Sequence, residues 1–457
     1  MVPWYSVPAA PAPPTNDEAE ADFYFEGPEK KLEVFFSAPP DAAGFRIFAP
    51  AVWSDVLAEA HCSILHTVGN ESFDSYLLSE SSLFVYPHKL ILKTCGTTTL
   101  LLTLPKIQKL AKQLRCCLSH VHYSHFRFGQ PQLQPYPHSS FTEEQDTLAT
   151  LLRGDLAAPP TARALGGPAD DDTAARWYAL CAEGLPAAAP LAELSAPAGV
   201  EPEPDVIELA MEGLPLGVCH AFFGESHAPL AGRELARRMT YVSGVGELMR
   251  DGTHIDDWAF SPCGYSMNAL RGPYYYTIHV TPEPGFSFAS FETNDPEYAT
   301  DEAVHAVLQV FEPSRCTVTL TSRRHVDSDV PPCAPFQSPP SAYGVVADWD
   351  TSRLSRHVGV SAVSYIRLPS PGPGGPTDGA ILLEDAAMSS ADSESTAPLD
   401  AGSDAASDKD VGSEGGSAEA ESSEGEVGGD KDEAAPRVVR KSVKDAAAKA
   451  AAAIRAA

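Results

Sequence analysis

Residues 75–101 read SYLLSESSLFVYPHKLILKTCGTTTLL, and this stretch predicts the fold class. The segments SYLLSE, SLFVY and KLILKT are short and bounded by turn-forming residues, and as a group they are rich in β-branched or aromatic residues, as in hairpin-linked strands. In the segment that follows, TTTLLLTLPKIQKLAKQLRCC, apolar residues recur at three- and four-residue intervals, which indicates a helix. Strands joined by tight turns and followed by a helix are typical of an antiparallel sheet in an α+β domain.

The rest of the chain repeats this order of strands and helices. HCSILHTV, RWYALCA and SAVSYIRL predict further strands, and a β-rich block runs from about Asp256 to Leu320. DEAVHAVLQVF and DVIELAMEGL both look helical, and residues 152–176, rich in Pro, Gly and Asp, read as a surface loop. Because the links are of hairpin length, we expect antiparallel sheets with outer helices and not alternating βαβ units.

The composition divides the chain into three parts. Residues 1–21 are rich in Pro, Ala and acids and predict a disordered extension, and residues 22–369 carry the strands and helices of one domain. Residues 370–457 form an acidic low-complexity tail. Within it, residues 370–435 hold 17 Asp and Glu against 2 Lys and Arg, which is half of the net charge of −30. Such a segment buries too little apolar surface to offset its ordering entropy, so we expect the tail to be disordered.

Charge and cysteine usage exclude several classes of function. An acidic chain is a poor candidate for binding nucleic acid, and no apolar run of about 18 residues predicts a membrane span. Nine cysteines without a CxxC pair, and a start without a basic and apolar leader, favour a reduced cytoplasmic protein. SHVHYSH brings His120, His122 and His125 together, but no carboxylate or Cys completes the set, so we expect no metal site.

The Ser-rich break between two strands is the first candidate for chemistry. A Ser hydroxyl can attack the carbonyl of its own strained peptide bond when a donor stabilises the oxyanion, and here that bond joins Glu80 to Ser81. Elimination from the resulting ester would leave dehydroalanine, and hydrolysis would convert it into a pyruvoyl group. A polar β-turn explains such a break more often.

Other candidates each have an ordinary structural alternative. Cys95 lies between a strand and a helix start, where the helix dipole would lower the pKa of its thiol, or it simply closes a turn. Ser266 follows a Gly-containing turn in FSPCGYSMN. His279 lies on a predicted strand, where a histidine is more often a satisfied core residue, and Glu283 lies between two prolines, where an acid is more often solvated.

Taken together, these segments resemble a known family. FEGPEKKLEV, YLLSESSLFV, LILKTCGTT, YPHSSFTEE, FSPCGYSMN and YTIHVTPEPGFSFASFETN occur in the order found in eukaryotic, plant- or algal-like S-adenosylmethionine decarboxylase proenzymes. The resemblance covers about Phe23 to Leu368 and fails near residues 155–175 and at both termini. It implies a four-layer αββα sandwich with two antiparallel β-sheets flanked by helices. It also implies an enzyme that converts S-adenosylmethionine to its decarboxylated form and CO2 for spermidine and spermine biosynthesis.

The resemblance further implies that the proenzyme cuts itself. The cut between Glu80 and Ser81 would give a β chain, 1–80, and an α chain, 81–457, that remain associated. Ser81 would become the pyruvoyl cofactor, which binds the substrate amine as a Schiff base. Ser266 would polarise the carbonyl or hold the oxyanion, and His279 would accept the α-proton in the elimination. Cys95 would donate the proton to the product carbon.

Substrate and regulatory residues follow from the same resemblance. Phe25 and Phe260 would hold adenine, Glu283 would bind the ribose, and further active-site residues are Glu26, Glu29 and Glu80. The acids of the putrescine pocket of animal enzymes are matched by Glu33, Glu208 and Glu292. Basic groups at Lys31 and His122 would replace the diamine, so we expect putrescine-independent activity and a monomer of one β and one α chain. The alternative is a catalytically inactive relative that acts as an activator subunit or interaction protein.

Overall fold

The computed structural model describes residues 25–166, 176–185, 203–323, 339–355 and 358–369. Their strands form two antiparallel sheets of eight strands each. The first has the order β2-β3-β4-β5-β1-β6-β8-β7 and the second the order β10-β11-β12-β13-β9-β14-β16-β15. The expected α+β class with antiparallel sheets is therefore confirmed. The disorder expected for 1–21 and for the tail concerns residues outside this described part.

The first sheet comes from the N-terminal half of the described chain. Its strands are β1 (Lys30–Phe36), β2 (Ile64–Gly69), β3 (Asp74–Leu78), β4 (Ser81–Val85), β5 (Lys89–Thr94), β6 (Leu118–Phe126), β7 (Thr161–Leu165) and β8 (Trp177–Glu183). Its helices are α1 (Pro50–Ala58), α2 (Leu104–Gln113) and α3 (Phe141–Leu151).

The second sheet repeats this plan. Its strands are β9 (Val206–Glu212), β10 (His254–Ala259), β11 (Tyr265–Arg271), β12 (Tyr274–Thr281), β13 (Phe288–Thr293), β14 (Arg315–Ser322), β15 (Tyr343–Arg353) and β16 (Gly359–Arg367). Its helices are α4 (Leu216–Cys219), α5 (Gly232–Val242) and α6 (Asp301–Phe311).

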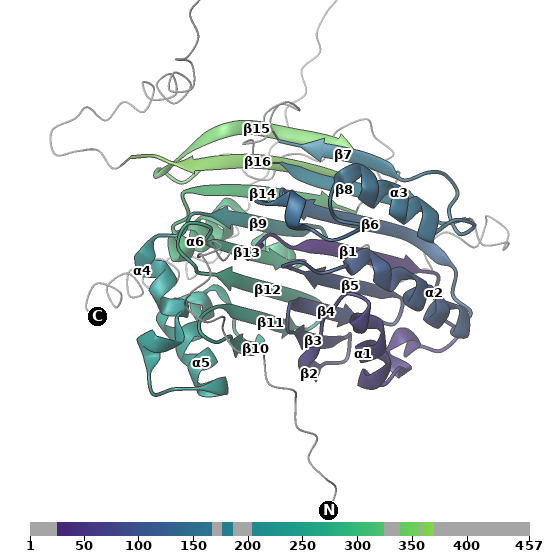
Figure 1. Ribbon diagram of the computed structural model, residues 1–457, viewed down its shortest axis with the longest axis horizontal. Helices are drawn as coiled ribbons and strands as arrows, with labels where there is room; N and C mark the ends of the chain where they lie inside the picture. Colours follow the sequence, from purple (N-terminus) through teal and green to yellow (C-terminus); the bar gives the residue numbers. More distant parts are fainter. Residues whose placement is uncertain (1–24, 167–175, 186–202, 324–338, 356–357, 370–457) are drawn as a thin grey trace, which may run out of the picture. The chain divides into compact units, whose positions relative to one another are not determined.

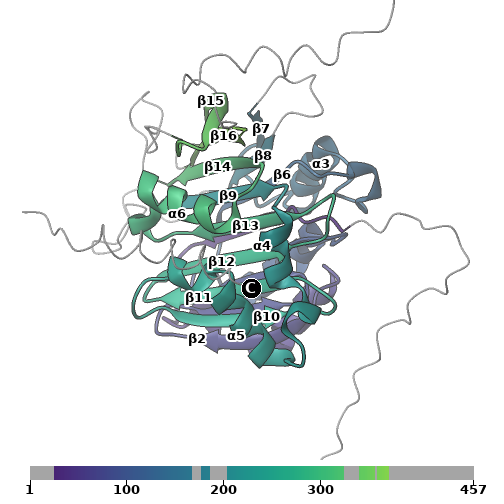
Figure 2. The ribbon, with the colours of Figure 1, turned by 90° about the vertical axis from the view of Figure 1, so that its left-hand side faces the viewer.

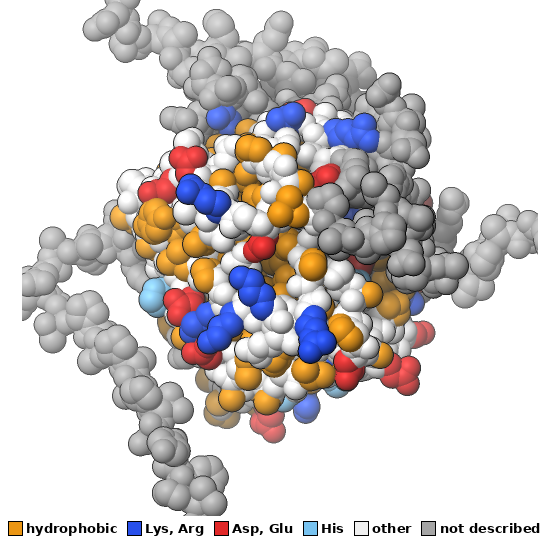
Figure 3. All heavy atoms as spheres, turned by 90° about the vertical axis from the view of Figure 1, so that its right-hand side faces the viewer, with side chains coloured by type: hydrophobic (Ala, Val, Ile, Leu, Met, Phe, Trp, Pro, Cys, Tyr) orange, Lys and Arg blue, Asp and Glu red, His pale blue; other side chains and the backbone are white. Residues whose placement is uncertain are grey.

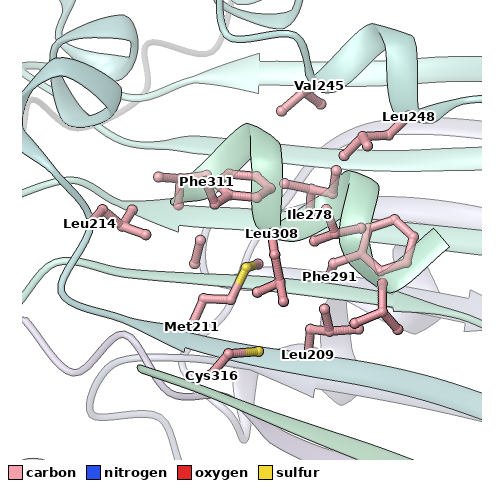
Figure 4. Packing of buried hydrophobic residues seen from close by; sticks show 14 of the residues in the cluster. Leu209, Met211, Leu214, Val245, Leu248, Ile278, Phe291, Leu308, Phe311 and Cys316 are labelled. Carbon is pink, nitrogen blue, oxygen red and sulfur yellow. The ribbon is translucent and has the colours of Figure 1, made fainter. Parts of the chain in front are cut away.

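Helices α4 to α6 lie on one side of the strands and α1 to α3 on the other (Figure 1). Viewed from the α4–α6 side, these helices lie in front of the second sheet (Figure 2). Each outer layer has its own apolar core. Figure 4 shows part of the core under α6, built from Leu209, Met211, Ile278, Phe291, Leu308, Phe311 and Cys316. On the face seen in Figure 3, basic, acidic and apolar side chains are interspersed.

Two sequence expectations about elements are wrong. Residues 205–214, expected to be helical, contain strand β9, which pairs with β13 and β14 in the middle of the second sheet. The interval 152–176, expected to be a loop, contains β7, which pairs with β8. The expected helices before Cys116 and at DEAVHAVLQVF are confirmed as α2 and α6.

The layer between the sheets is polar where the middle strands face each other. Along a strand, alternate side chains point to opposite faces. On β12, Ile278 belongs to the outer core, so its neighbour His279 points toward the first sheet. On β9, Leu209 and Met211 likewise face the helices, whereas Glu208 reaches Lys31 of the first sheet. Alternation in both sheets therefore gathers polar residues in one buried layer, beside smaller apolar clusters.

Candidate active site

The Glu80–Ser81 bond lies at the tight turn between β3 and β4. Leu78 pairs with Ser81 across the two strands, so the turn consists of Ser79 and Glu80. Ser81 is buried and has φ of +126°, a backbone conformation that a residue with a side chain rarely adopts. Strain of this kind persists only where the surrounding structure enforces it, and it is frequent at functional sites.

His279 lies at the centre of the contacts around Ser81. Its Nε2 lies 3.1 Å from Ser81 Oγ and 3.1 Å from Ser82 Oγ. Its Nδ1 lies 2.8 Å from Ser266 Oγ, on the neighbouring strand β11. Burial lowers the pKa of His279 to about 4, although the charge of Glu29 opposes this shift. The imidazole is therefore neutral at pH 7 and can accept a proton.

Glu29 connects this histidine to a buried lysine. Ser81 Oγ donates a hydrogen bond of 3.0 Å to Glu29 Oε1, which lies 3.3 Å from His279 Nε2. The other carboxylate oxygen lies 3.3 Å from Lys93 Nζ. Burial acts to raise the pKa of Glu29, but the charges of Lys93 and His279 outweigh it, so the pKa lies below its usual value. Glu29 is therefore an anion beside Ser81.

The Glu80 carbonyl accepts a hydrogen bond from the turn after β5. The Cys95 backbone N–H donates to it at 3.1 Å, and Cys95 Sγ lies 3.6 Å from the same oxygen. Gly96 completes the turn with φ of +62°, and a side chain there would meet the Phe25 ring at 3.2 Å and Glu80 Oε2 at 3.4 Å. The positive φ and these contacts therefore favour glycine at this position.

The expectation that a helix start would lower the pKa of Cys95 is wrong. Burial raises the pKa of this thiol well above its usual value, and the charges of Glu80 and Glu29 add to the effect. The first helical turn after β5 begins only at Leu100, too far along the chain to act on the thiol as its own helix end. Cys95 is consequently held as a protonated thiol.

The predicted substrate-binding residues come from both sheets. Glu26 accepts hydrogen bonds from Gly129 N at 2.8 Å and Gln130 N at 3.1 Å, beside the Phe25 ring that packs near Gly96. Phe260 and Glu283 follow β10 and β12, and Glu283 Oε2 is buried without a hydrogen-bond partner among the described residues. No ring contact joins Phe25 and Phe260 in the described structure.

The residues of the predicted putrescine-like pocket are brought together as ion pairs. Lys31 Nζ lies 2.9 Å from Glu208 and 3.1 Å from Glu292, and both acids are also reached by Lys93 at 3.3 and 2.8 Å. Burial and the neighbouring Glu292 raise the pKa of Glu208 to about 7, while the pKa of Glu292 stays low against burial because the two lysines stabilise its charge.

Glu33, the third acid of this pocket, has partners of its own. It accepts from His122 Nδ1 at 3.0 Å and forms an ion pair with Arg323. Against the effect of burial, Arg323 and His122 hold the pKa of Glu33 well below its usual range. Burial lowers the pKa of His122, so the expected cationic role of His122 is wrong, and the acids of the pocket are neutralised by Arg323 and the two lysines.

Four further residues of this layer were missed by the sequence analysis: Ser82, Lys93, Asn268 and Arg323. Ser82 Oγ donates to Asn268 Oδ1 at 2.5 Å, and Asn268 Nδ2 donates to the Tyr76 carbonyl at 3.1 Å, so Asn268 links the two sheets beside the turn. Lys93 could have been found from strand alternation, since it lies two positions after the inward-facing Ile91. No comparable signal marks Arg323, which follows the end of β14.

Among the described residues no group of three or more His, Cys, Asp and Glu side chains is arranged to hold a metal ion. His122 contacts Glu33, and His125 Nε2 lies 2.9 Å from Glu144, so two of the three histidines of SHVHYSH belong to separate contacts. No described helix has the length and apolarity needed to cross a membrane.

Comparison with known proteins identifies one family. A family model described as "Adenosylmethionine decarboxylase" matches residues 22–346. The chain is 39% identical over 314 residues to an S-adenosylmethionine decarboxylase proenzyme of Pisum sativum, a match that covers 66% of this chain and 81% of the relative. A proenzyme of the same description from Spinacia oleracea is 40% identical over 306 residues, 65% of this chain and 78% of the relative.

Among solved structures, the chain is similar to the "AdoMetDC-delta26 monomer" of Trypanosoma brucei, with 25% identity and a TM-score of 0.44 over 63% of this chain and 99% of that one. The family match spans most of the chain, and it includes β3, β4 and the turn between them. This chain belongs to the adenosylmethionine decarboxylase family.

Proposed function

We propose that this chain is a proenzyme that cuts itself between Glu80 and Ser81 and then decarboxylates S-adenosylmethionine. The observation that carries the proposal is the strained Ser81, with its hydroxyl 3.1 Å from a neutral histidine and the preceding carbonyl bonded to the Cys95 N–H. Family membership supplies the reaction, and this geometry supports the assignment of roles to residues.

The first step is a shift of the Glu80 acyl group from nitrogen to oxygen. Ser81 Oγ attacks the Glu80 carbonyl carbon, a C–O bond forms, and the C–N bond breaks as Ser81 N gains a proton. The Cys95 N–H, 3.1 Å from the Glu80 oxygen, stabilises the oxyanion. Sequence analysis gave that task to Ser266, but Ser266 Oγ bonds His279 Nδ1, which supports a role in orienting the imidazole.

The second step releases the two chains. His279 Nε2 takes the Cα proton of Ser81, the bond from Cβ to oxygen breaks, and Glu80 leaves as a carboxylate. The dehydroalanine that remains takes up water and loses ammonia, which gives the pyruvoyl group. Because burial holds the pKa of His279 at about 4, its neutral form is available for this proton transfer throughout the physiological range.

The residues around Ser81 fit a pyruvoyl group. Ser81 is 2% exposed, so a group formed there is shielded from water, and Glu29 and His279, which contact Ser81 Oγ, would lie beside that group. When bound, the group supplies an electron sink for loss of CO2. Cys95, held as a thiol, would give its proton to the product carbon. Phe25, Phe260 and Glu283 would bind the adenosyl part of the substrate.

The pocket contacts support activity without putrescine. Lys31 and Lys93 form ion pairs with Glu208 and Glu292 and thus supply the positive charge that a diamine would otherwise supply. The acids therefore lack the uncompensated charge that would attract a diamine. The monomeric state and cytoplasmic location expected from the sequence stay predictions.

Mass measurement under denaturing conditions tests the self-cutting. Wild type is expected to give two chains divided after Glu80, the larger one starting with a pyruvoyl group, and Ser81→Ala is expected to stay intact. Ser79→Ala is the matched control, because Ser79 lies in the same turn but accepts a hydrogen bond from Ser63 N. A wild-type chain that stays intact would instead favour the inactive relative.

Release of CO2 from carboxyl-labelled S-adenosylmethionine tests the second half of the proposal. The divided wild-type protein should release CO2 without added diamine, whereas Ser81→Ala should not. Divided chains that release no CO2 would refute the decarboxylase assignment and leave the proposed self-cutting intact.

A further inference from the structure

Lys30 is a buried lysine that the proposed mechanism does not use. It is 0% exposed on β1, and its Nζ donates to the Gly96 carbonyl and to Gln134 Oε1, both at 2.9 Å. The ammonium group also lies 5.1 Å from the centre of the Phe128 ring. A buried cation without a compensating contact would be costly, so these neutral partners and the ring hold it in place.

Lys30 differs from the other buried lysines of the first sheet. Lys31, Lys89 and Lys93 each lie within 3.3 Å of at least one carboxylate oxygen. Lys30 forms no such ion pair with the residues that the structure describes. With no carboxylate at ion-pair distance among the described residues, its charge acts on several neighbouring groups, among them Cys95 and Glu144.

The contacts of Lys30 lead to the Cys95 thiol of the active site. Lys30 holds the carbonyl of Gly96, the residue directly after Cys95, while the Gly96 N–H donates to the Glu26 carbonyl at 2.8 Å. Both backbone groups of Gly96 are thus fixed. The Lys30 charge also lowers the pKa of Cys95, against the dominant effect of burial and the charges of Glu80 and Glu29.

We propose that Lys30 is a positioning residue for Cys95, which fixes the Cys95–Gly96 turn and supplies the positive charge that stabilises the thiolate. The inference rests on the proposed function, in which Cys95 donates a proton to the product carbon. In that step the S–H bond breaks, the proton moves to carbon, and the electron pair stays on sulfur. Solvent returns a proton to sulfur before the next turnover.

Self-cutting makes this charge more important. The cut turns the Glu80 carbonyl, now 3.6 Å from Cys95 Sγ, into part of a new carboxylate. A second negative charge beside the thiol would oppose formation of a thiolate. Burial lowers the pKa of Lys30 to about 8, although Cys95 and Glu144 raise it, so most Lys30 side chains still carry their charge at pH 7. Lys30 is thus a cation at the pH at which Cys95 must act.

The experiment uses the full chain and three substitutions. Lys30→Met removes the charge and the hydrogen bonds, Lys30→Gln keeps a donor without charge, and Lys30→Arg keeps both. Lys89→Met is the matched control, because Lys89 is also buried in the same sheet but pairs with Glu203 at 2.5 Å. The readout is the rate of alkylation of Cys95 by iodoacetamide at pH 7.0, where Lys30 is mostly charged, measured by mass spectrometry with the exposed Cys117 as internal reference.

Both neutral variants should slow Cys95 alkylation about tenfold, which corresponds to one unit of thiol pKa, and Cys117 should not change. Lys30→Arg and Lys89→Met should keep the wild-type rate. In CO2 release, kcat of Lys30→Met and Lys30→Gln should fall about threefold to tenfold with little change in KM, as expected of a weaker proton donor.

Three outcomes would overturn the inference. One is a Cys95 alkylation rate in Lys30→Met equal to that of wild type. Another is slow alkylation in Lys30→Met together with the wild-type rate in Lys30→Gln, which would mean that the hydrogen bond matters and the charge does not. The third is failure of both neutral variants to fold while Lys89→Met folds, which would make Lys30 purely structural. The alkylation readout needs no activity. A wild-type chain that fails to cut or to release CO2 would therefore refute the proposed function and leave the test of Lys30 intact.

Discussion

The outer layers of this molecule and the layer between its sheets are built from the same strands by opposite chemistry. On one face of β12, Tyr276 and Ile278 pack in the apolar core under the helices. On the other face, Thr277 and His279 meet hydroxyls, carboxylates and ammonium groups. Burial of apolar surface stabilises a fold directly, whereas burial of charge must be compensated by partners. The outer layers thus provide stability, and the inner layer provides the chemistry.

The largest effect should come from the inner layer. His279→Ala is expected to slow self-cutting about 10²- to 10⁴-fold, because it removes the proton acceptor, while the free energy of unfolding changes far less. The measurement is the fraction of divided chain against time after refolding, with urea unfolding of the same variant as control. Full cutting at the wild-type rate would exclude His279 from the reaction.

A substitution in the outer layer should reverse this pattern. Leu209, under α6, is fully buried in the apolar core, so Leu209→Ala is expected to lower the free energy of unfolding by about 2–5 kcal/mol. The folded fraction should still cut itself completely. Urea unfolding and mass measurement on one sample check both points. Loss of cutting in a well-folded Leu209→Ala chain would show that the two layers are not independent.

The third prediction concerns the charged pocket. Millimolar putrescine should not raise the rate of CO2 release by wild type severalfold, because Lys31 and Lys93 already form ion pairs with the acids. Lys31→Ala should leave room and uncompensated charge beside Glu208, so its activity should fall and putrescine should restore it severalfold. CO2 release with and without the diamine measures this. Severalfold stimulation of wild type would contradict the pocket assignment.

The smallest expected effect is that of pH on self-cutting. His279 acts in its neutral form, and burial lowers its pKa to about 4, so the rate should stay flat from pH 8 down to pH 6. It should fall only as the pH approaches 4, where the imidazole gains a proton. Initial cutting rates in a buffer series measure this. A decline centred near pH 6.5 would mean that His279 titrates like an exposed histidine.

Short strand segments joined by links of hairpin length, as in residues 75–101, predict the antiparallel class, and the quoted motifs identify the family. The prediction of a helix at β9 was wrong because DVIELAMEGL is rich in Glu, Leu, Ala and Met, which favour helices. Pairing with β13 and β14 overrides that preference. Lys93 and Arg323 were missed because a charged residue on or beside a strand usually points to solvent. Alternation with the inward-facing Ile91 marks Lys93 in retrospect, whereas the burial of Arg323 becomes apparent only once Glu33 of the opposite sheet is in place.

The order of strands has a consequence for assembly. In the first sheet, β1 comes from the proposed 1–80 chain and lies between β5 and β6 of the 81–457 chain. Division at Glu80 would therefore leave one polypeptide with a vacant slot in the middle of its sheet, filled by a strand from the other. Such a slot exposes unpaired backbone groups on both sides when empty. The two pieces expressed separately should therefore assemble poorly. An uncut chain would be required for folding, whereas the folded structure would remain stable after the cut.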